Sequence, residues 1–130
     1  KKLAKYILCK LEQDAADRAC DPLTDPGTIE QVLPENPGAV WDSHFPPERQ
    51  ENYVYRIGNL TLLEASINRA VGAGAYADKC GAYATSAYAL TQALVEMAPE
   101  EWSPEHVQQR QRKMAARAHH IWRSDFETGQ

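Results

Sequence analysis

Apolar residues at the start of the chain repeat with the period of a helix. They occupy positions i, i+3, i+4 and i+8, which lie on one helix face: Leu3, Tyr6, Ile7 and Leu11. This spacing predicts an amphipathic helix over residues 1–18. The pattern then fades into a polar stretch, and two proline-containing turns follow.

The next apolar segments are short and rich in β-prone residues. Thr28–Leu33 stops at a proline and predicts a strand. Residues 53–63 share this character, with Gly58-Asn59 as a turn or bulge, and predict a second strand. Between them, residues 34–52 hold four prolines and many polar groups, which predicts a long loop with one short helical turn. Loops of this length inside a domain are usually functional or poorly ordered.

The rest of the chain has helical patterns. Residues 64–71 predict a short helix that a glycine ends, and the alanine-rich residues 75–97 predict a long one. Ser103-Pro104 supplies an N-cap and a first-turn proline for a last helix, so the C-terminal helices cover about residues 75–124. The order of elements predicts an α+β fold.

Composition narrows the class of protein without identifying it. The chain has 130 residues, which fits one domain, and its net charge of −4 gives no overall basic field for nucleic acids. Three cysteines lie far apart and form no CxxC motif, so a reducing, cytoplasmic environment is expected. No apolar run is long enough to cross a membrane. The helical pattern starts at once, without an initiator methionine, so we expect a fragment of a larger protein.

Polar residues stand on both predicted strands and on the helix that follows them. Glu30 and Gln31 lie near the end of the first strand, and Asn59 lies in the second, nine residues before Asn68. A carboxylate and an amide can bind a hard cation through oxygen. Metal-dependent hydrolysis of a phosphodiester also needs a general base that takes a proton from water. This order of strand, loop, strand and helix suits one metal ion held against a phosphodiester.

Several segments of the chain resemble one known family. TIEQVLPENP, YVYRIGNLTLLEASINR and RQRKMAARAHHIWR closely follow the C-terminal nuclease domain of GmrSD-type proteins, which are type IV, modification-dependent restriction endonucleases. The resemblance runs from the first helix to Trp122, and GNLTLLEASINR is its most specific part. That domain belongs to the HNH, or ββα-metal, nuclease superfamily. The resemblance therefore implies a ββα-metal core over about residues 28–72, surrounded by helices.

The resemblance also implies a role for each of the four polar residues. Glu30 and Asn68 would bind the metal, and Asn59 would orient a general base at position 31. The family has His in a Glu-His-Ile-Leu-Pro strand, whereas this chain has Gln31, so the motif is Gln-Asn-Asn instead of His-Asn-Asn. Glutamine cannot accept a proton near neutral pH. Loss of a positioned general base typically costs about 10²–10⁴ in rate.

The glutamine has two explanations at the level of sequence. An engineered His→Gln change would trap an inactive nuclease, and a natural Gln31 would indicate a degenerate nuclease or one whose base lies elsewhere. His44, in the long loop, is the histidine near enough in sequence to replace it. Each of the other three residues also has a plain structural explanation. Glu30 would be a solvated carboxylate, Asn59 a left-handed turn residue, and Asn68 a surface amide or cap.

Six basic residues are candidates for DNA binding: Arg56, Lys79, Arg110, Arg112, Lys113 and Arg117. Residues 110–123 contain basic side chains and no acid, a pattern that can neutralise phosphates by releasing counterions. A solvated helix face, and for Lys79 a solvated surface charge, is the alternative interpretation. The three tryptophans are expected to pack in the core.

The resemblance implies a metal-dependent DNA endonuclease module of a phage-defence system. Oxygen ligands favour Mg²⁺, or Mn²⁺, as the cofactor. The expected partners are DNA and an N-terminal nucleotide-hydrolysing or sensing domain of the same protein, with no membrane. Two other functions stay open: a degenerate, non-catalytic module that binds DNA or a partner domain, and a plain helical interaction domain.

Overall fold

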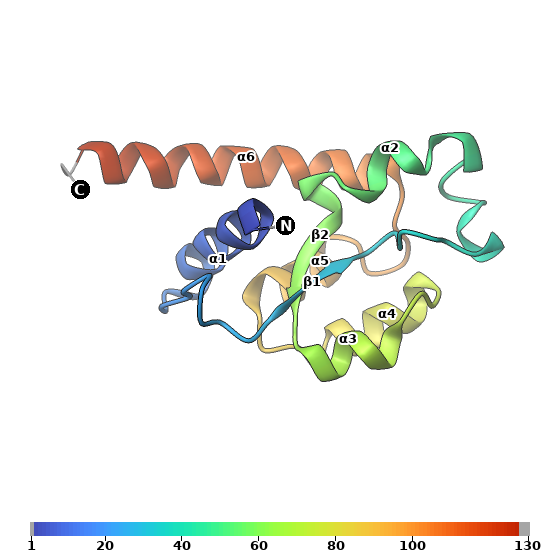
Figure 1. The fold of residues 1–130 in the computed structure, drawn as a ribbon. Coiled ribbons are helices and arrows are strands. Elements are labelled where there is room, and N and C mark those ends of the chain that lie inside the picture. The colour runs from blue at the N-terminus through green and yellow to red at the C-terminus, as the bar shows by residue number, and fades with distance from the viewer. Residues whose placement is uncertain (1, 128–130) are drawn as a thin grey trace.

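Two short antiparallel strands lie at the centre of the molecule, and helices surround them (Figure 1). The computed structural model describes the backbone of residues 2–127 and the side chains of residues 2–123. Its elements confirm the α+β fold: α1 Lys2–Ala16, β1 Thr28–Gln31, η1 Ala39–Trp41, η2 Pro47–Arg49, α2 Glu51–Val54, η3 Ile57–Asn59, β2 Leu60–Leu63, α3 Ala65–Val71, α4 Tyr76–Tyr83, α5 Ala89–Met97 and α6 Pro104–Glu127.

The sheet and the helix after it form a strand–strand–helix unit. β1 and β2 pair in a register that joins Thr28 to Leu63 and Gln31 to Leu60. α3 begins two residues after β2 and packs against β1. A pair of four-residue strands is marginal by itself in water, so the surrounding helices must stabilise it. In Figure 1 the strands lie between the long α6 on one side and the α3–α4 pair on the other.

Two predicted elements are wrong in extent. Residues 53–63 were expected to be β-prone throughout, but Tyr53 and Val54 belong to α2 and the strand begins at Leu60. The long helix predicted over residues 75–97 is interrupted between α4 and α5. The Glu64 carboxylate causes this interruption, because it accepts hydrogen bonds from the Ser86 hydroxyl and from the backbone N–H of Ala87. These bonds hold the segment that leads into α5, where Tyr88 has extended geometry with φ −77° and ψ 125°.

The buried face of α1 also differs from the predicted one. Leu3 is 69% exposed and Tyr6 is 38% exposed, whereas the buried face carries Leu8, Cys9, Leu11 and Glu12. Glu12 determines this orientation, because its carboxylate accepts the backbone N–H groups of Ala89 and Leu90. Those two groups belong to the first turn of α5 and have no partner inside their own helix. A carboxylate from α1 therefore caps α5 across the core.

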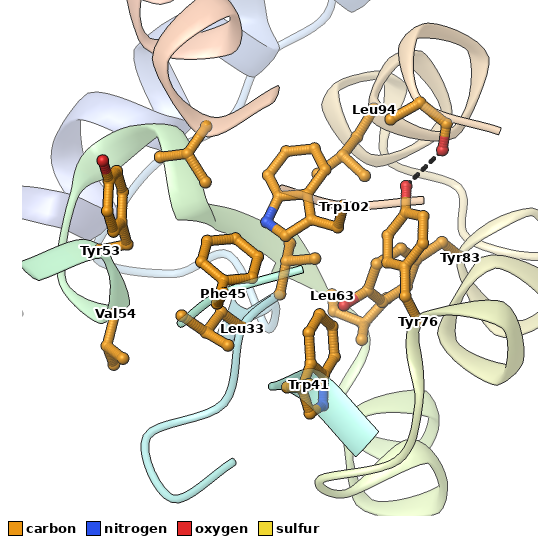
Figure 2. Close-up of a cluster of buried hydrophobic side chains, with 13 residues drawn as sticks. Leu33, Trp41, Phe45, Tyr53, Val54, Leu63, Tyr76, Tyr83, Leu94 and Trp102 are labelled. Atoms are coloured by element: carbon orange, nitrogen blue, oxygen red, sulfur yellow. Dashed lines mark hydrogen bonds between the residues drawn. The ribbon is translucent and has the colours of Figure 1, made fainter. Parts of the chain in front are cut away.

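Aromatic side chains dominate the core on the α4 side of the sheet (Figure 2). Trp102 stacks on Tyr76, and Trp41 packs edge-on against the same ring. The Tyr76 hydroxyl donates to the carbonyl of Ala98 at 2.5 Å, the dashed line in Figure 2. Trp41 and Trp102 are thus packing residues, as expected, whereas Trp122 is 40% exposed. None of the described helices is both long and apolar enough to cross a membrane.

Gly58 is needed for a close approach of two backbones. The turn or bulge expected at Gly58-Asn59 is the 3₁₀ turn η3, and neither residue has a positive φ. The left-handed role considered for Asn59 is therefore wrong. A Cβ on Gly58 would lie 2.3 Å from the carbonyl oxygen of Val107 in α6. The absent side chain lets η3 pack directly on α6.

Replacing Gly58 with alanine should therefore destabilise the fold strongly. Gly58→Ala forces η3 away from α6, and we expect a loss of about 2–3 kcal/mol in the free energy of unfolding, measured by urea denaturation. Gly38→Ala is the matched control, because a Cβ there meets nothing within 4 Å. It should change stability by less than about 1 kcal/mol. Equal effects of the two substitutions would contradict the proposed contact.

Candidate functional site

Glu30 lies at the centre of a buried polar cluster. It is the third residue of β1 and only 4% exposed, so it is not a solvated strand-end carboxylate. Its Oε2 accepts a hydrogen bond from Lys79 Nζ at 2.9 Å and another from the Tyr83 hydroxyl at 2.5 Å. Burial raises the pKa of Tyr83 well above its usual value, so the hydroxyl keeps its proton and donates it. Both partners come from α4.

Lys79 is fully buried and has no donor left for another group. Its ammonium donates to Glu30 Oε2, to the Gln31 carbonyl at 2.9 Å and to the Val32 carbonyl at 3.0 Å. An ammonium has three N–H donors, so all are used. Burial lowers the pKa of Lys79, and the charge of Glu30 opposes that shift. The predicted contact of Lys79 with DNA is therefore wrong, because the side chain faces the core.

Asn68 reaches β1 from the helix that follows the sheet. Its Nδ2 donates to Thr28 Oγ1 at 2.8 Å and is 3.5 Å from the carbonyl oxygen of Ile29. Thr28 and Glu30 are two residues apart on a strand and thus share one face of it. The structure brings Asn68 to the face of β1 that carries Glu30. A plain surface amide does not make these contacts.

Two oxygens of this face remain available to a ligand. Within the described residues, no donor reaches Oε1 of Glu30 or Oδ1 of Asn68. A carboxylate and an amide oxygen are ligands suited to Mg²⁺, which usually keeps several of its waters. The donor set therefore fits a hard cation chemically, although Lys79 already neutralises part of the charge on Glu30.

Gln31 is half-buried and takes part in a different set of contacts. It ends β1, and its Nε2 is 3.4 Å from the carbonyl oxygen of Val54 in α2. Successive strand residues point to opposite faces, which explains why Glu30 contacts α4 whereas Gln31 contacts α2. The Gln31 amide thus donates to a carbonyl and offers no group that would take a proton.

Asn59 fixes the chain immediately after Gln31. Its side chain is fully buried and makes four hydrogen bonds. Oδ1 accepts the backbone N–H of Leu33 and Nε1–H of Trp102, both at 2.9 Å. Nδ2 donates to the carbonyls of Leu33 and Val54, both at 3.0 Å. The Val54 carbonyl is therefore shared by Asn59 and Gln31, and Asn59 positions residue 31 through the backbone.

The six basic candidates divide into buried and accessible groups. Lys79 and Arg110 are buried, and Arg110 Nη1 donates to the carbonyls of Gly58 and Leu60. Burial lowers the pKa of Arg110 to about 10. Arg110 therefore supports η3 and β2 from α6, and its predicted contact with DNA is wrong. The remaining four are exposed: Arg56, Arg112, Lys113 and Arg117.

Two accessible residues already have partners within the chain. Arg117 Nε lies 3.1 Å from Asp14 Oδ2, which links α6 to α1. Arg56 lies over the ring of Tyr53, with its guanidinium carbon 4.6 Å from the ring centroid. His44, the alternative base, pairs with Glu101 at 3.1 Å. Among the described residues, His44 has no recorded contact with Glu30, Gln31 or Asn68.

The sequence interpretation missed the partners of the polar residues. Lys79 and Tyr83 are four residues apart, so they share one face of α4. This spacing could have indicated that both contact the same group. Glu12 follows Leu8 and Leu11 at helical spacing, so an acid stood within an apolar stripe. Nothing in the sequence indicated that Trp102 would donate to Asn59, because they are 43 residues apart.

One comparison with known proteins gave a match. A family model described as "GmrSD restriction endonucleases, C-terminal domain" matches residues 1–117. No curated protein and no solved structure matches the chain significantly. The matched range includes the whole sheet, α3, α4 and the polar clusters around Glu30 and Asn59.

Removing the buried ammonium should destabilise the protein severely. Lys79→Met leaves the Glu30 carboxylate buried without its cation, which typically costs about 3–5 kcal/mol. Lys113→Met is the control, since that lysine is exposed and should change stability by about 0.5 kcal/mol or less. Urea denaturation of both variants measures the difference. A similarly small cost for both would show that Lys79 does not support the fold.

Truncation of Asn59 should also destabilise the fold. Asn59→Ala leaves the Trp102 N–H and the backbone groups of Leu33 without partners in a dry core, and we expect a loss of at least about 2 kcal/mol. Asn52→Ala, at an exposed asparagine of α2, should have little effect. Thermal denaturation of the two variants side by side tests this difference, and an Asn59→Ala protein as stable as Asn52→Ala would refute it.

Proposed function

We propose that this chain, which belongs to the family of C-terminal domains of GmrSD restriction endonucleases, is a metal-dependent DNA endonuclease module of a phage-defence system. Its proposed partners are DNA and an N-terminal nucleotide-hydrolysing or sensing domain of the same protein. The family supports a restriction nuclease, and the residues of the strand–strand–helix unit support the HNH type of chemistry.

One observation carries this proposal more than any other. Asn68 of α3 bonds to β1 at Thr28, on the strand face that carries Glu30. An amide from α3 and a carboxylate from β1 thus lie on the same face of the strand, each with an oxygen that no described donor occupies. In the proposed nuclease these two oxygens hold Mg²⁺ or Mn²⁺. When bound, the ion stabilises negative charge that develops on the phosphate.

The chain's own residues have separate roles in this proposal. Glu30 and Asn68 provide the ligands, while Tyr83 and Lys79 hold the Glu30 carboxylate in one orientation. Asn59 fixes the backbone after position 31, where the general base is expected. Because Gln31 cannot take the proton of an attacking water, we propose that the chain has little or no nuclease activity in this form.

The accessible basic residues are the proposed contacts with DNA. Arg112 and Lys113 are exposed on α6, so their side chains can reach phosphates without any rearrangement of the core. Arg56 lies three residues before Asn59 and stays exposed while it packs on Tyr53. Arg117 would have to exchange Asp14 for a phosphate, which makes its contribution smaller.

A non-catalytic module is the second candidate, and two observations favour it. Gln31 replaces the expected base, and Lys79 already pairs with the carboxylate that would bind the metal. A domain with these features would keep the nuclease fold while binding DNA or its partner domain. The two candidates differ in whether a histidine at position 31 is enough to produce cleavage.

A plasmid-nicking assay with Mg²⁺ or Mn²⁺ separates the candidates. We expect the unaltered chain to cut little or not at all, and Gln31→His to cut about 10²–10⁴ times faster, which is the usual contribution of a positioned general base. Asn68→Ala in the Gln31→His background is the matched control. It should be silent, because the imidazole remains while a metal ligand is lost.

Each result of this assay has a distinct meaning. Cleavage by the unaltered chain at the rate of Gln31→His would place the base elsewhere. Cleavage that survives Asn68→Ala would refute the metal role of Asn68. If neither the unaltered chain nor Gln31→His cuts, while both bind the plasmid in a mobility-shift assay, the non-catalytic module replaces the nuclease proposal.

A further inference from the structure

Two of the three cysteines meet a carboxylate away from the Glu30 cluster. Cys9 lies on α1, whereas Cys20 and Asp25 lie in the loop that leads from α1 to β1. One sulfur or oxygen from each residue lies within 4.8 Å of the other two. Cys9 and Cys20 are buried, and Asp25 is half-buried. No part of the proposed nuclease chemistry uses these residues.

We propose that Cys9, Cys20 and Asp25 form a binding site for Zn²⁺, with a water molecule as the fourth ligand, as in zinc sites that have three protein ligands. The site would join α1 to the loop before β1 and so fix the position of the first strand. It differs in ligand chemistry from the oxygen site at Glu30 and Asn68.

The ligand types and their spacing fit a zinc ion. Zinc prefers thiolate, imidazole and carboxylate ligands in a tetrahedral arrangement with Zn–S bonds of about 2.3 Å. Two sulfurs of such a site lie about 3.8 Å apart, as the tetrahedral angle requires. The observed upper limit of 4.8 Å therefore needs only a small side-chain adjustment. Mg²⁺ would not select two thiols, because it is a hard cation.

Two donors reach one oxygen of the Asp25 carboxylate, and among the described residues none reaches the other oxygen. Its Oδ2 accepts the Tyr88 hydroxyl at 2.6 Å and the backbone N–H of Gly27 at 3.0 Å. Outer hydrogen bonds of this kind orient the carboxylates that bind metals. A Cβ on Gly27 would lie 2.1 Å from the Tyr88 hydroxyl oxygen, so this arrangement depends on the glycine.

The charge of the site is balanced by a neighbouring lysine. Lys5 donates to the carbonyls of Asp25 and Gly27, and its Nζ lies 3.9 Å from Asp25 Oδ2. Two thiolates and one carboxylate carry three negative charges, of which Zn²⁺ neutralises two. Lys5 neutralises the third. Glu12 cannot be the fourth ligand, because both its oxygens accept N–H groups from α5.

Metal binding at this site must displace thiol protons. Without a metal, burial raises the pKa of the Cys20 thiol to about 12, and the neighbouring Cys9 adds to this effect. The Cys20 thiol therefore keeps its proton in the metal-free protein, and because Zn²⁺ binds the thiolate form, its binding releases thiol protons to solvent. No electron is transferred in this step, in contrast to the formation of a disulfide between the same two cysteines.

Cobalt substitution of the reduced, metal-free chain tests the proposal directly. We expect one equivalent of Co²⁺ to produce thiolate-to-cobalt charge-transfer bands and the visible bands of a tetrahedral ion. One equivalent of Zn²⁺ should remove them and raise the melting temperature. Co²⁺ at Glu30 and Asn68 would give no thiolate bands, so the result does not depend on the nuclease proposal.

Variants of the cysteines provide the matched comparison. Cys20→Ser should abolish the charge-transfer bands, whereas Cys80→Ser should keep them, because Cys80 lies on α4 outside the cluster. Asp25→Asn keeps both thiols and should weaken the affinity for Co²⁺ about ten-fold or more. Circular dichroism confirms that each variant is folded.

Three outcomes would overturn the zinc site. These are a reduced chain that gives no thiolate bands, a Cys20→Ser variant that gives the full bands, and a Cys80→Ser variant that loses them. Free thiols are counted in the unfolded protein without added reductant. A count of three excludes a disulfide. A value of one would replace the metal site with a Cys9–Cys20 disulfide.

Discussion

The buried pair of Glu30 and Lys79 is the interaction on which the centre of the molecule depends. An isolated charge in this position would be strongly destabilising, so each residue requires the other. Lys79 also donates to the carbonyls of Gln31 and Val32, where the chain leaves β1. One ammonium therefore joins α4 to the only described sheet at the point where the polar residues gather. The short strands need such support, because four residues each give them little stability of their own.

The same pair constrains any chemistry at this site. A carboxylate that is already paired with an ammonium attracts a divalent cation less strongly than a free one. Lys79 cannot move away easily, since all its donors are used inside the core. In the proposed nuclease, a metal ion at Glu30 would therefore bind Oε1, with Asn68 and water as the other ligands, while Oε2 stays with Lys79 and Tyr83. In this arrangement the ion has one carboxylate with a partly compensated charge, so weak binding is expected.

The sequence predicted the order of elements and the positions of the polar residues better than their partners. The strand at Thr28, the helix over residues 65–71 and the start of α6 follow from local patterns of apolar residues, glycine and proline. The break between α4 and α5 does not, because Glu64 causes it from another element. The buried face of α1 is set in the same way by the bonds of Glu12 to α5. Basic residues were the least predictable, since Arg110 and Arg112 look alike in sequence while one is buried and the other exposed.

Position 31 is held from two sides by groups that do not depend on its own side chain. Lys79 bonds to the carbonyls of residues 31 and 32, and Asn59 binds both backbone groups of Leu33. The backbone of Asn59 also accepts the N–H of Val32 at 3.0 Å. Such fixed backbone geometry is what a catalytic base needs, because its orientation must be set before the reaction. Gln31 makes only one long hydrogen bond of its own, to Val54. Hydrogen bonds therefore fix the backbone around position 31 more firmly than the glutamine side chain requires. For the proposed nuclease, this points to the residue at position 31, rather than the fold, as what would limit catalysis.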